Sequence, residues 1–197
     1  MPENKVVFGL KKIAVAVATI AADGTATYAS PIMVPGARSI SLEPQGELTP
    51  WYADNMAYYT SDDFTGYQGD LEVARFPDAV MAAIWHEATA GNGLKYEANG
   101  QEAVHFALLF EFSGDAQETR HVFYNCTATR PAVASATKED TTEPQTSTTT
   151  ITATPIYVAA LTKNVLKARC NPGDSAYDAF YSAVTLPTAP AAQSGTT

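Results

Sequence analysis

The chain has 197 residues, the size of one ordinary domain with or without a short appendage. Hydrophobic residues make up 46% of it and charged residues 17%, which excludes disorder of the whole chain, because disordered chains are poor in apolar residues and rich in charge. Twelve Lys and Arg against 21 Asp and Glu give a formal net charge of -9, which argues against binding of nucleic acid through a basic patch. No apolar run approaches the roughly 18 residues of a membrane span, so no membrane insertion is expected.

The two cysteines are too few for a disulfide framework or a structural zinc site of their own. Cys126 and Cys170 lie far apart in the sequence and form no CxxC pair. We expect two reduced, partly buried thiols in a cytosolic protein. The alternative is a single bridge in a secreted one.

The apolar stretch near the start of the chain has two interpretations. Residues 13–22 follow two lysines, and a positive flank before a short apolar core is typical of a signal peptide. The same residues alternate large and small side chains, as a single strand does. Asp23-Gly24 and residues 25–30 would then supply a hairpin turn and a partner strand. The acidic Glu3 in the would-be flank favours the strand.

Two further segments alternate between apolar and polar residues and are expected to be strands with one face on a core. In residues 37–43 the core side is Ile40 and Leu42, and the opposite face is Ser39, Ser41 and Glu43. In residues 67–74 the core side is Tyr67, Leu71 and Val73, and the opposite face is Gln68, Asp70 and Glu72.

The rest of the chain predicts more strands and one substantial helix. The helix begins at Pro77, carries Val80, Met81, Ile84 and Trp85 at helical spacing, and is expected to end at Gly91-Asn92-Gly93. Further strands are expected at 104–112, either buried on both faces or mixed, and at 119–129, 146–154 and 165–169, with a short helix at 174–183. The fold class is therefore mainly β, an antiparallel sandwich or barrel with one flanking helix.

Familiar chemical motifs are incomplete in this chain. His86-Glu87 lacks the second histidine of a zinc protease, because position 90 is alanine. Gly173-Asp174-Ser175 precedes the expected short helix, where Asp or Ser is an ordinary cap, and no histidine follows it. Asp62, Asp63 and Asp70 lack calcium-loop spacing and would make at most a weak cation site. His105 and His121 are expected to be neighbouring polar residues on paired strands. We therefore expect no catalytic residues, no metal site and no cofactor.

A long aromatic segment between residues 44 and 66 stands out, because connectors are seldom this long or this rich in rings. It holds Trp51, Tyr52, Tyr58 and Tyr59 among polar residues. Tyrosine and tryptophan are enriched at protein interfaces, where they cover apolar area and keep a polar handle. The segment is expected to form a subunit contact; the alternative is that its rings pack into the core of their own domain.

Several blocks in the same order resemble the major tail proteins of long-tailed bacteriophages, the subunits of the tail tube. The resemblance runs from about residue 6 to residue 187. It rests on the blocks Phe8–Ile13, Pro35–Gly46, Trp51–Asn55, Gly66–Glu72, Phe106–Phe112, Arg120–Pro131 and Glu143–Thr146.

The resemblance implies a β-sandwich or barrel with a flanking helix and a long protruding loop or hairpin. It implies a tail-tube domain at 1–187, and residues 188–197 would be a flexible C-terminal tail. Subunits of this family form hexameric rings that stack into a tube around a tape-measure protein, with tail terminator and distal tail proteins as further partners. The location implied is the virion tail, after synthesis in the host cytoplasm. The contact to the next ring would involve Trp51, Tyr52, Asn55, Tyr58 and Tyr59.

A tube of this kind must let double-stranded DNA pass without specific binding, and carboxylates and hydroxyls suit its lining because they do not grip phosphates. The candidates for the lining are Ser39, Ser41, Glu43, Gln68, Asp70 and Glu72. These residues could equally face the outer surface of the tube. The rival function is a secreted β-sandwich for adhesion or carbohydrate binding, with cleavage near Ala22 and a Cys126–Cys170 bridge.

Overall fold

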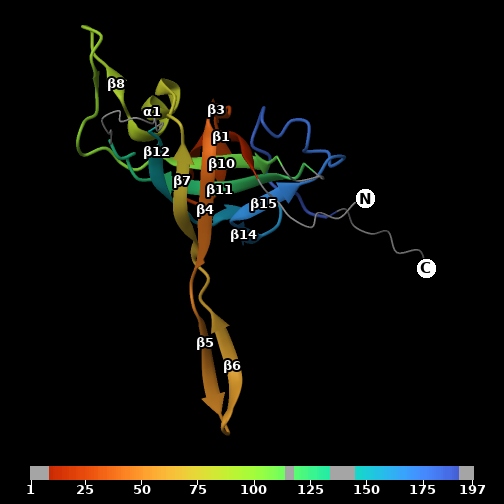
Figure 1. Cartoon of the computed structure of the whole chain (residues 1–197). Coiled ribbons are helices and arrows are strands. Elements are labelled where there is room, and N and C mark those ends of the chain that lie inside the picture. Colours follow the sequence, from red (N-terminus) through yellow and green to blue (C-terminus); the bar gives the residue numbers. More distant parts are fainter. Residues whose placement is uncertain (1–8, 114–117, 134–144, 191–197) are drawn as a thin grey trace.

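The computed structural model describes residues 9–113, 118–133 and 145–190, which form fifteen strands and one helix (Figure 1). The mainly antiparallel β architecture with a single helix confirms the predicted fold class. The elements are β1 (Leu10–Ile20), β2 (Ala26–Tyr28), β3 (Ile32–Val34), β4 (Ala37–Gln45), β5 (Leu48–Ala53), β6 (Met56–Asp62), β7 (Gly66–Val73), α1 (Asp78–Trp85), β8 (Ala88–Thr89), β9 (Lys95–Tyr96), β10 (His105–Phe112), β11 (Arg120–Ala128), β12 (Ser147–Ala153), β13 (Ile156–Val158), β14 (Lys163–Val165) and β15 (Lys167–Cys170).

A nine-stranded sheet forms the body, in the order β2-β1-β10-β11-β12-β7-β4, with β3 also beside β1 and β15 also beside β11. The sheet divides at β11, whose first half pairs with β15 and whose second half pairs with β12. β1 and β4 lie near opposite ends of the strand order and still contact each other, so the sheet is strongly curled. The apolar N-terminal stretch is β1, paired with β10 on one side and with β2 and β3 on the other, as its strand interpretation predicts.

Two apolar cores lie on opposite faces of this sheet. Successive residues of β10 alternate between them: Phe106 and Leu108 belong to the first core, Ala107 and Leu109 to the second. This confirms that the strand is buried on both faces. The first core fills the concave side of the sheet and includes the apolar face of α1. The second core lies under β13 and the C-terminal segment, which contributes Phe180.

The helix α1 is shorter than predicted. Val80, Ile84 and Trp85 are buried as the spacing indicates, and the Trp85 indole Nε1 donates a hydrogen bond to the Thr129 carbonyl at 3.0 Å. His86 adopts a left-handed conformation with φ 59° and donates its backbone N–H to the Met81 carbonyl, which ends the helix there. Residues 91–93 are instead the turn between β8 and β9.

Two other sequence expectations are wrong, and a third is right only in part. Residues 174–183 form successive turns instead of a second helix. His105 and His121 lie toward opposite ends of the β10–β11 pair, because His105 is opposite Ala18 and His121 is opposite Phe110. Residues 165–169 are divided between β14 and β15.

The two thiols are free and buried, as expected, and they belong to different cores. Cys126 lies in the first core and Cys170 in the second, with the sheet between them. The bridge required by the secreted alternative is therefore absent. The predicted flexible tail at 188–197 falls largely outside the described residues.

Candidate assembly surfaces

The six predicted lining residues form one continuous polar face. In the β4–β7 register Ser39 is opposite Glu72, Ser41 is opposite Asp70, and Glu43 is opposite Gln68. All six lie on the face of the sheet opposite the first core, because the residues between them are the buried or half-buried ones. The two alternating patterns in the sequence therefore belong to adjacent strands with matched faces.

Threonines of β12 extend this face by a third strand, a feature that the sequence analysis missed. Thr148 is opposite Glu72, Thr150 is opposite Asp70, and Thr152 is opposite Gln68. We call the resulting nine residues the polar face: Ser39, Ser41, Glu43, Gln68, Asp70, Glu72, Thr148, Thr150 and Thr152. The period-two spacing of the threonines could have indicated it, but the pairing of residues about 80 positions apart could not be read from the sequence.

Hydrogen bonds hold the carboxylates of the polar face in place. The Thr150 hydroxyl donates to Asp70 Oδ1 at 2.8 Å, and the Ser39 hydroxyl donates to Glu72 Oε2 at 3.1 Å. Thr146 donates to Glu72 Oε1 at 2.5 Å, and the Arg38 guanidinium lies 2.7 Å from the same oxygen. The hydrogen bond from Thr146, followed by those from Ser39 and Arg38 and the charge of Arg38, lowers the pKa of Glu72 below its ordinary value. Glu72 is therefore ionised at neutral pH.

The strands that carry the polar face contribute more acids than bases. β4, β7 and β12 contain Glu43, Asp70 and Glu72, and Arg38 is their single basic residue. Because Arg38 is bound to Glu72, its charge is partly neutralised locally. The face is therefore negative and rich in hydroxyls.

The predicted aromatic segment is a two-stranded hairpin, β5 and β6, that projects far from the body (Figure 1). Its turn is Asp54-Asn55, with φ 52° and 62°; two positive φ values are what a two-residue type I′ turn requires. Asn55, predicted as a contact residue, thus lies at the tip and has a conformational role. An Asp-Asn pair between β-prone residues is the local signal that could have revealed this turn.

The side chains of this hairpin have no core of their own. Trp51 is 59% exposed and Tyr58 is 71% exposed, and their rings meet edge to face with centroids 6.1 Å apart. Leu48, Tyr52, Met56 and Tyr59 are similarly exposed. The alternative in which these rings pack into their own domain is therefore wrong. An isolated two-stranded hairpin is at best marginally stable in water, and a contiguous exposed apolar patch of this kind marks an interaction surface.

An open apolar groove of about 640 Å³ lies on the concave side of the sheet, between β4 and β15. Its walls include Ile40 and Leu42 from β4, Tyr67 from β7, and Phe110, Phe112 and Phe123 from β10 and β11. Lys167 and Arg169 from β15 also line it. Among the described residues, Lys167 forms no ion pair with a carboxylate. Its ammonium donates a hydrogen bond to the Tyr67 hydroxyl at 2.8 Å. This groove could not be predicted from local sequence patterns, because it is assembled from five strands.

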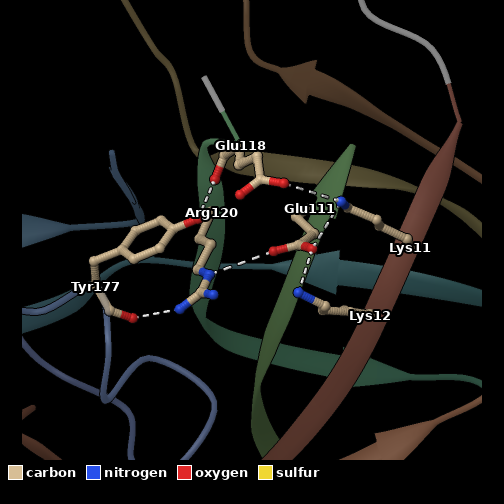
Figure 2. A network of polar contacts seen from close by, with 6 residues as sticks. All are labelled: Lys11, Lys12, Glu111, Glu118, Arg120 and Tyr177. Atoms are coloured by element: carbon tan, nitrogen blue, oxygen red, sulfur yellow. Dashed lines mark hydrogen bonds and ion pairs between the residues drawn. The ribbon is translucent and has the colours of Figure 1, made fainter. Parts of the chain in front are cut away.

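A buried carboxylate lies where β1, β10 and β11 meet the C-terminal segment (Figure 2). The Glu111 side chain is 1% exposed and is surrounded by Lys12 Nζ at 2.8 Å, Lys11 Nζ at 3.3 Å and Arg120 Nε at 3.3 Å. Burial alone raises the pKa of Glu111, but the hydrogen bonds and charges of Lys12 and Lys11 outweigh it, so that the net shift is downward. Arg120 also donates to the Tyr177 carbonyl and stacks on the Tyr177 ring, which fastens the C-terminal segment to the sheet.

The described part of the chain holds neither a cluster of metal-ligating side chains nor a helix that could span a membrane. There, no group of three or more His, Cys, Asp or Glu side chains could hold a metal ion. His86 caps a helix and its ring lies 3.3 Å from the Glu102 carbonyl, away from any zinc-binding arrangement. No helix in residues 9–113, 118–133 and 145–190 is long and apolar enough to cross a bilayer.

Comparison with known proteins identifies the family of the chain. No curated protein is similar to it at a significant level. A family model described as phage tail tube protein matches residues 2–183, nearly the entire sequence. That family is structural and not a family of enzymes, and its members are components of the virion tail. The chain belongs to the phage tail tube protein family.

Proposed function

We propose that this protein assembles into hexameric rings that stack into the tail tube, and that the polar face lines the channel through which double-stranded DNA leaves the virion. The observation that carries this proposal is the polar face itself. It is an exposed, three-stranded surface of carboxylates and hydroxyls in a family whose members form tubes.

Electrostatics favours the polar face for the lining. A cationic wall would bind phosphates and release their counterions, which would retard the DNA. The polar face carries three carboxylates, and its neighbouring base is already bound to one of them. Its hydroxyls hydrate the wall without supplying fixed positive charge. Negative potential in a narrow channel keeps DNA from adsorbing as it passes.

The aromatic hairpin supplies the contact between rings. Its aromatic side chains are exposed and the hairpin projects from the body, which suits a contact with a copy in the next hexameric ring of the tube (Figure 1). We expect the segment from Pro44 to Gly66 to be mobile in the free subunit and ordered in the tube, since Trp51, Tyr52, Tyr58 and Tyr59 are each more than half exposed in the single chain. The tape-measure protein inside the tube and the tail terminator and distal tail proteins at its ends complete the proposed set of partners, and synthesis takes place in the host cytoplasm.

Cysteine labelling of assembled tubes tests where the polar face lies. Gln68→Cys places a thiol on the middle strand of this face, and the native thiols are buried and give little background. We expect a small maleimide to react and a maleimide carried on a protein wider than the bore to be excluded. The matched control, Lys163→Cys on the exposed strand β14, should either react with both or with neither. Reaction of Gln68→Cys with both reagents would place the polar face on the outside and refute the lining.

A further inference from the structure

The groove between β4 and β15 is lined mainly by side chains that belong to the first core or pack against it, on the side of the sheet opposite the polar face, and Ser41 is the one polar-face residue in its lining. We propose that it is the seat of the β5–β6 hairpin of a second copy. The inference rests on the proposed function, and it adds the receiving surface for a contact whose other half is exposed on the hairpin.

The groove cannot be filled by the hairpin of the same chain. β5 and β6 leave the body at the ends of β4 and β7 and lead directly away from it (Figure 1). The hairpin and the groove therefore remain open together in the isolated subunit. Binding of the hairpin of one copy in the groove of another would cover both surfaces in a single contact.

Shape and apolar character match on the two sides. The groove offers about 640 Å³ lined by aromatic and aliphatic side chains. Pockets of roughly 300–1,000 Å³ accommodate a drug-sized molecule, so the groove can receive more than one aromatic side chain. The hairpin presents Trp51, Tyr52, Tyr58 and Tyr59, each more than half exposed. Aromatic anchors inserted into a preformed apolar pocket are the usual centre of a strong interface.

The charges of the two surfaces are complementary. Residues 46–65 include Glu47, Asp54, Asp62 and Asp63 and contain no lysine or arginine. The groove is flanked by Lys167 and Arg169, both exposed on β15. The Lys167 ammonium lies 4.4 Å from the centre of the ring of Tyr67, which also lines the groove. An acidic hairpin is therefore attracted to the aromatic groove by its basic rim.

A contact between two different surfaces of the same chain has a consequence for assembly. Each copy offers one hairpin and one groove, so two copies joined by one contact still have one free hairpin and one free groove between them. Such heterologous contacts do not close after two copies and generate open arrays. A tube of stacked rings is one such array.

Two complementary variants test the proposal in the full-length chain. Trp51→Ser with Tyr58→Ser removes the anchors and leaves the groove, whereas Lys167→Glu with Arg169→Glu reverses the rim and leaves the hairpin. The altered side chains are exposed, so both variants should fold, which near-ultraviolet circular dichroism would check. We expect each variant alone to need at least a 30-fold higher concentration than wild type to form long assemblies.

Mixing the two variants gives the decisive result. Only one productive contact is possible in the mixture, between the intact hairpin of one variant and the intact groove of the other. We expect particles of twice the mass of either variant alone, with no further growth. The control for charge is Arg75→Glu with Lys163→Glu, which makes the same change in net charge away from the groove and should assemble as wild type does.

The possible failures are distinguishable. If wild type itself forms no assemblies, the proposed function fails. If wild type assembles and the Lys167→Glu, Arg169→Glu variant assembles equally well, or if the mixture forms no doubled particle, the groove is not the seat and only this inference is overturned.

Cross-linking provides a second, independent measurement. A photoreactive phenylalanine derivative at position 58 should attach, in assembled protein, to peptides that contain Leu42, Tyr67, Phe123 or Lys167. Mixing isotope-labelled and unlabelled chains shows whether the link joins two copies. Attachment to β13, β14 or the C-terminal segment would overturn the proposal.

Discussion

Removing the buried charge at Glu111 should destabilise the domain substantially. Glu111→Gln keeps the size of the side chain and leaves Lys11, Lys12 and Arg120 without their common counter-ion. Breaking a fully buried ion pair by removing one partner costs about 3–5 kcal/mol. The cost here is smaller, because Lys11 and Lys12 are 31% and 50% exposed and regain water, whereas Arg120 is only 14% exposed. We therefore expect a loss of about 2–4 kcal/mol in the free energy of unfolding.

Thermal and urea unfolding at neutral pH measure this loss. For a domain of this size each kcal/mol corresponds to about 2–4 °C in Tm, so Tm should fall by roughly 5–15 °C. The control is Glu118→Gln, since the Glu118 side chain is 62% exposed and lies 3.9 Å from Lys11. Exposed pairs of this kind contribute about 0–1 kcal/mol, so the control should be close to wild type.

The pH dependence supplies a further check on the same residue. The pKa of Glu111 in the folded state lies below its ordinary value, so its carboxylate contributes stability above the unfolded pKa of about 4.3. That contribution is lost as the pH falls through the folded pKa. The stability difference between wild type and Glu111→Gln should thus be constant from about pH 6 to 8 and shrink below about pH 4.3. A loss below about 0.5 kcal/mol at neutral pH, or a difference that does not change with pH, would refute this account of the cluster.

Two substitutions and one labelling experiment probe the hairpin, the sheet and the first core. Trp51→Ala should raise the concentration needed for assembly by about 30-fold or more, because truncating an aromatic anchor costs about 2 kcal/mol or more. The Tm of the unassembled subunit should stay within about 2 °C of wild type. If light scattering shows that the variant assembles as readily as wild type, this prediction is contradicted. Gly69→Ala should cost about 3 kcal/mol in urea unfolding, since its Cβ would lie 1.8 Å from the Ser41 carbonyl oxygen, whereas Gly91→Ala, with nothing within 4 Å, should change stability by less than about 0.5 kcal/mol. Burial raises the pKa of the Cys126 thiol, so it should react with a maleimide at pH 8 only on unfolding, and fast labelling of the native protein would show that the first core is open.

The strand faces were predictable because they depend on local alternation. Ser39, Ser41 and Glu43 alternate with Ile40 and Leu42, and a period of two can place these sets only on opposite faces. The neighbouring strand obeys the same rule. What the sequence could not provide was the register that sets Ser41 opposite Asp70 and Thr150, because pairing between distant segments has no local signal.

The failed helix at 174–183 shows where local patterns mislead. Tyr177, Phe180 and Tyr181 have helix-like spacing, but each of these rings is held by the sheet or by its neighbours in separate turns. The Tyr177 hydroxyl donates to the Glu118 carbonyl at 3.0 Å, and the Tyr124 hydroxyl donates to the Thr185 carbonyl at 3.0 Å. A short helix is marginal on its own, so these contacts decide the backbone conformation.

For α1 the sequence predicted the helix correctly but placed its C-terminal end too late. The glycines at 91 and 93 are the expected stop signal, and a histidine in the left-handed conformation is uncommon. The groove and the Glu111 cluster could not be predicted from the sequence either, because their residues come from strands far apart along the chain. Lys12 and Glu111, for example, are about 100 positions apart and meet only when β1 pairs with β10.

Electron microscopy of the purified full-length protein over a range of concentrations tests the central claim most directly. The account predicts hollow tubes of stacked rings, with β4, β7 and β12 around the bore and their carboxylates toward its axis. Particles that remain monomeric at every concentration, or tubes whose bore is lined by basic side chains, would contradict it.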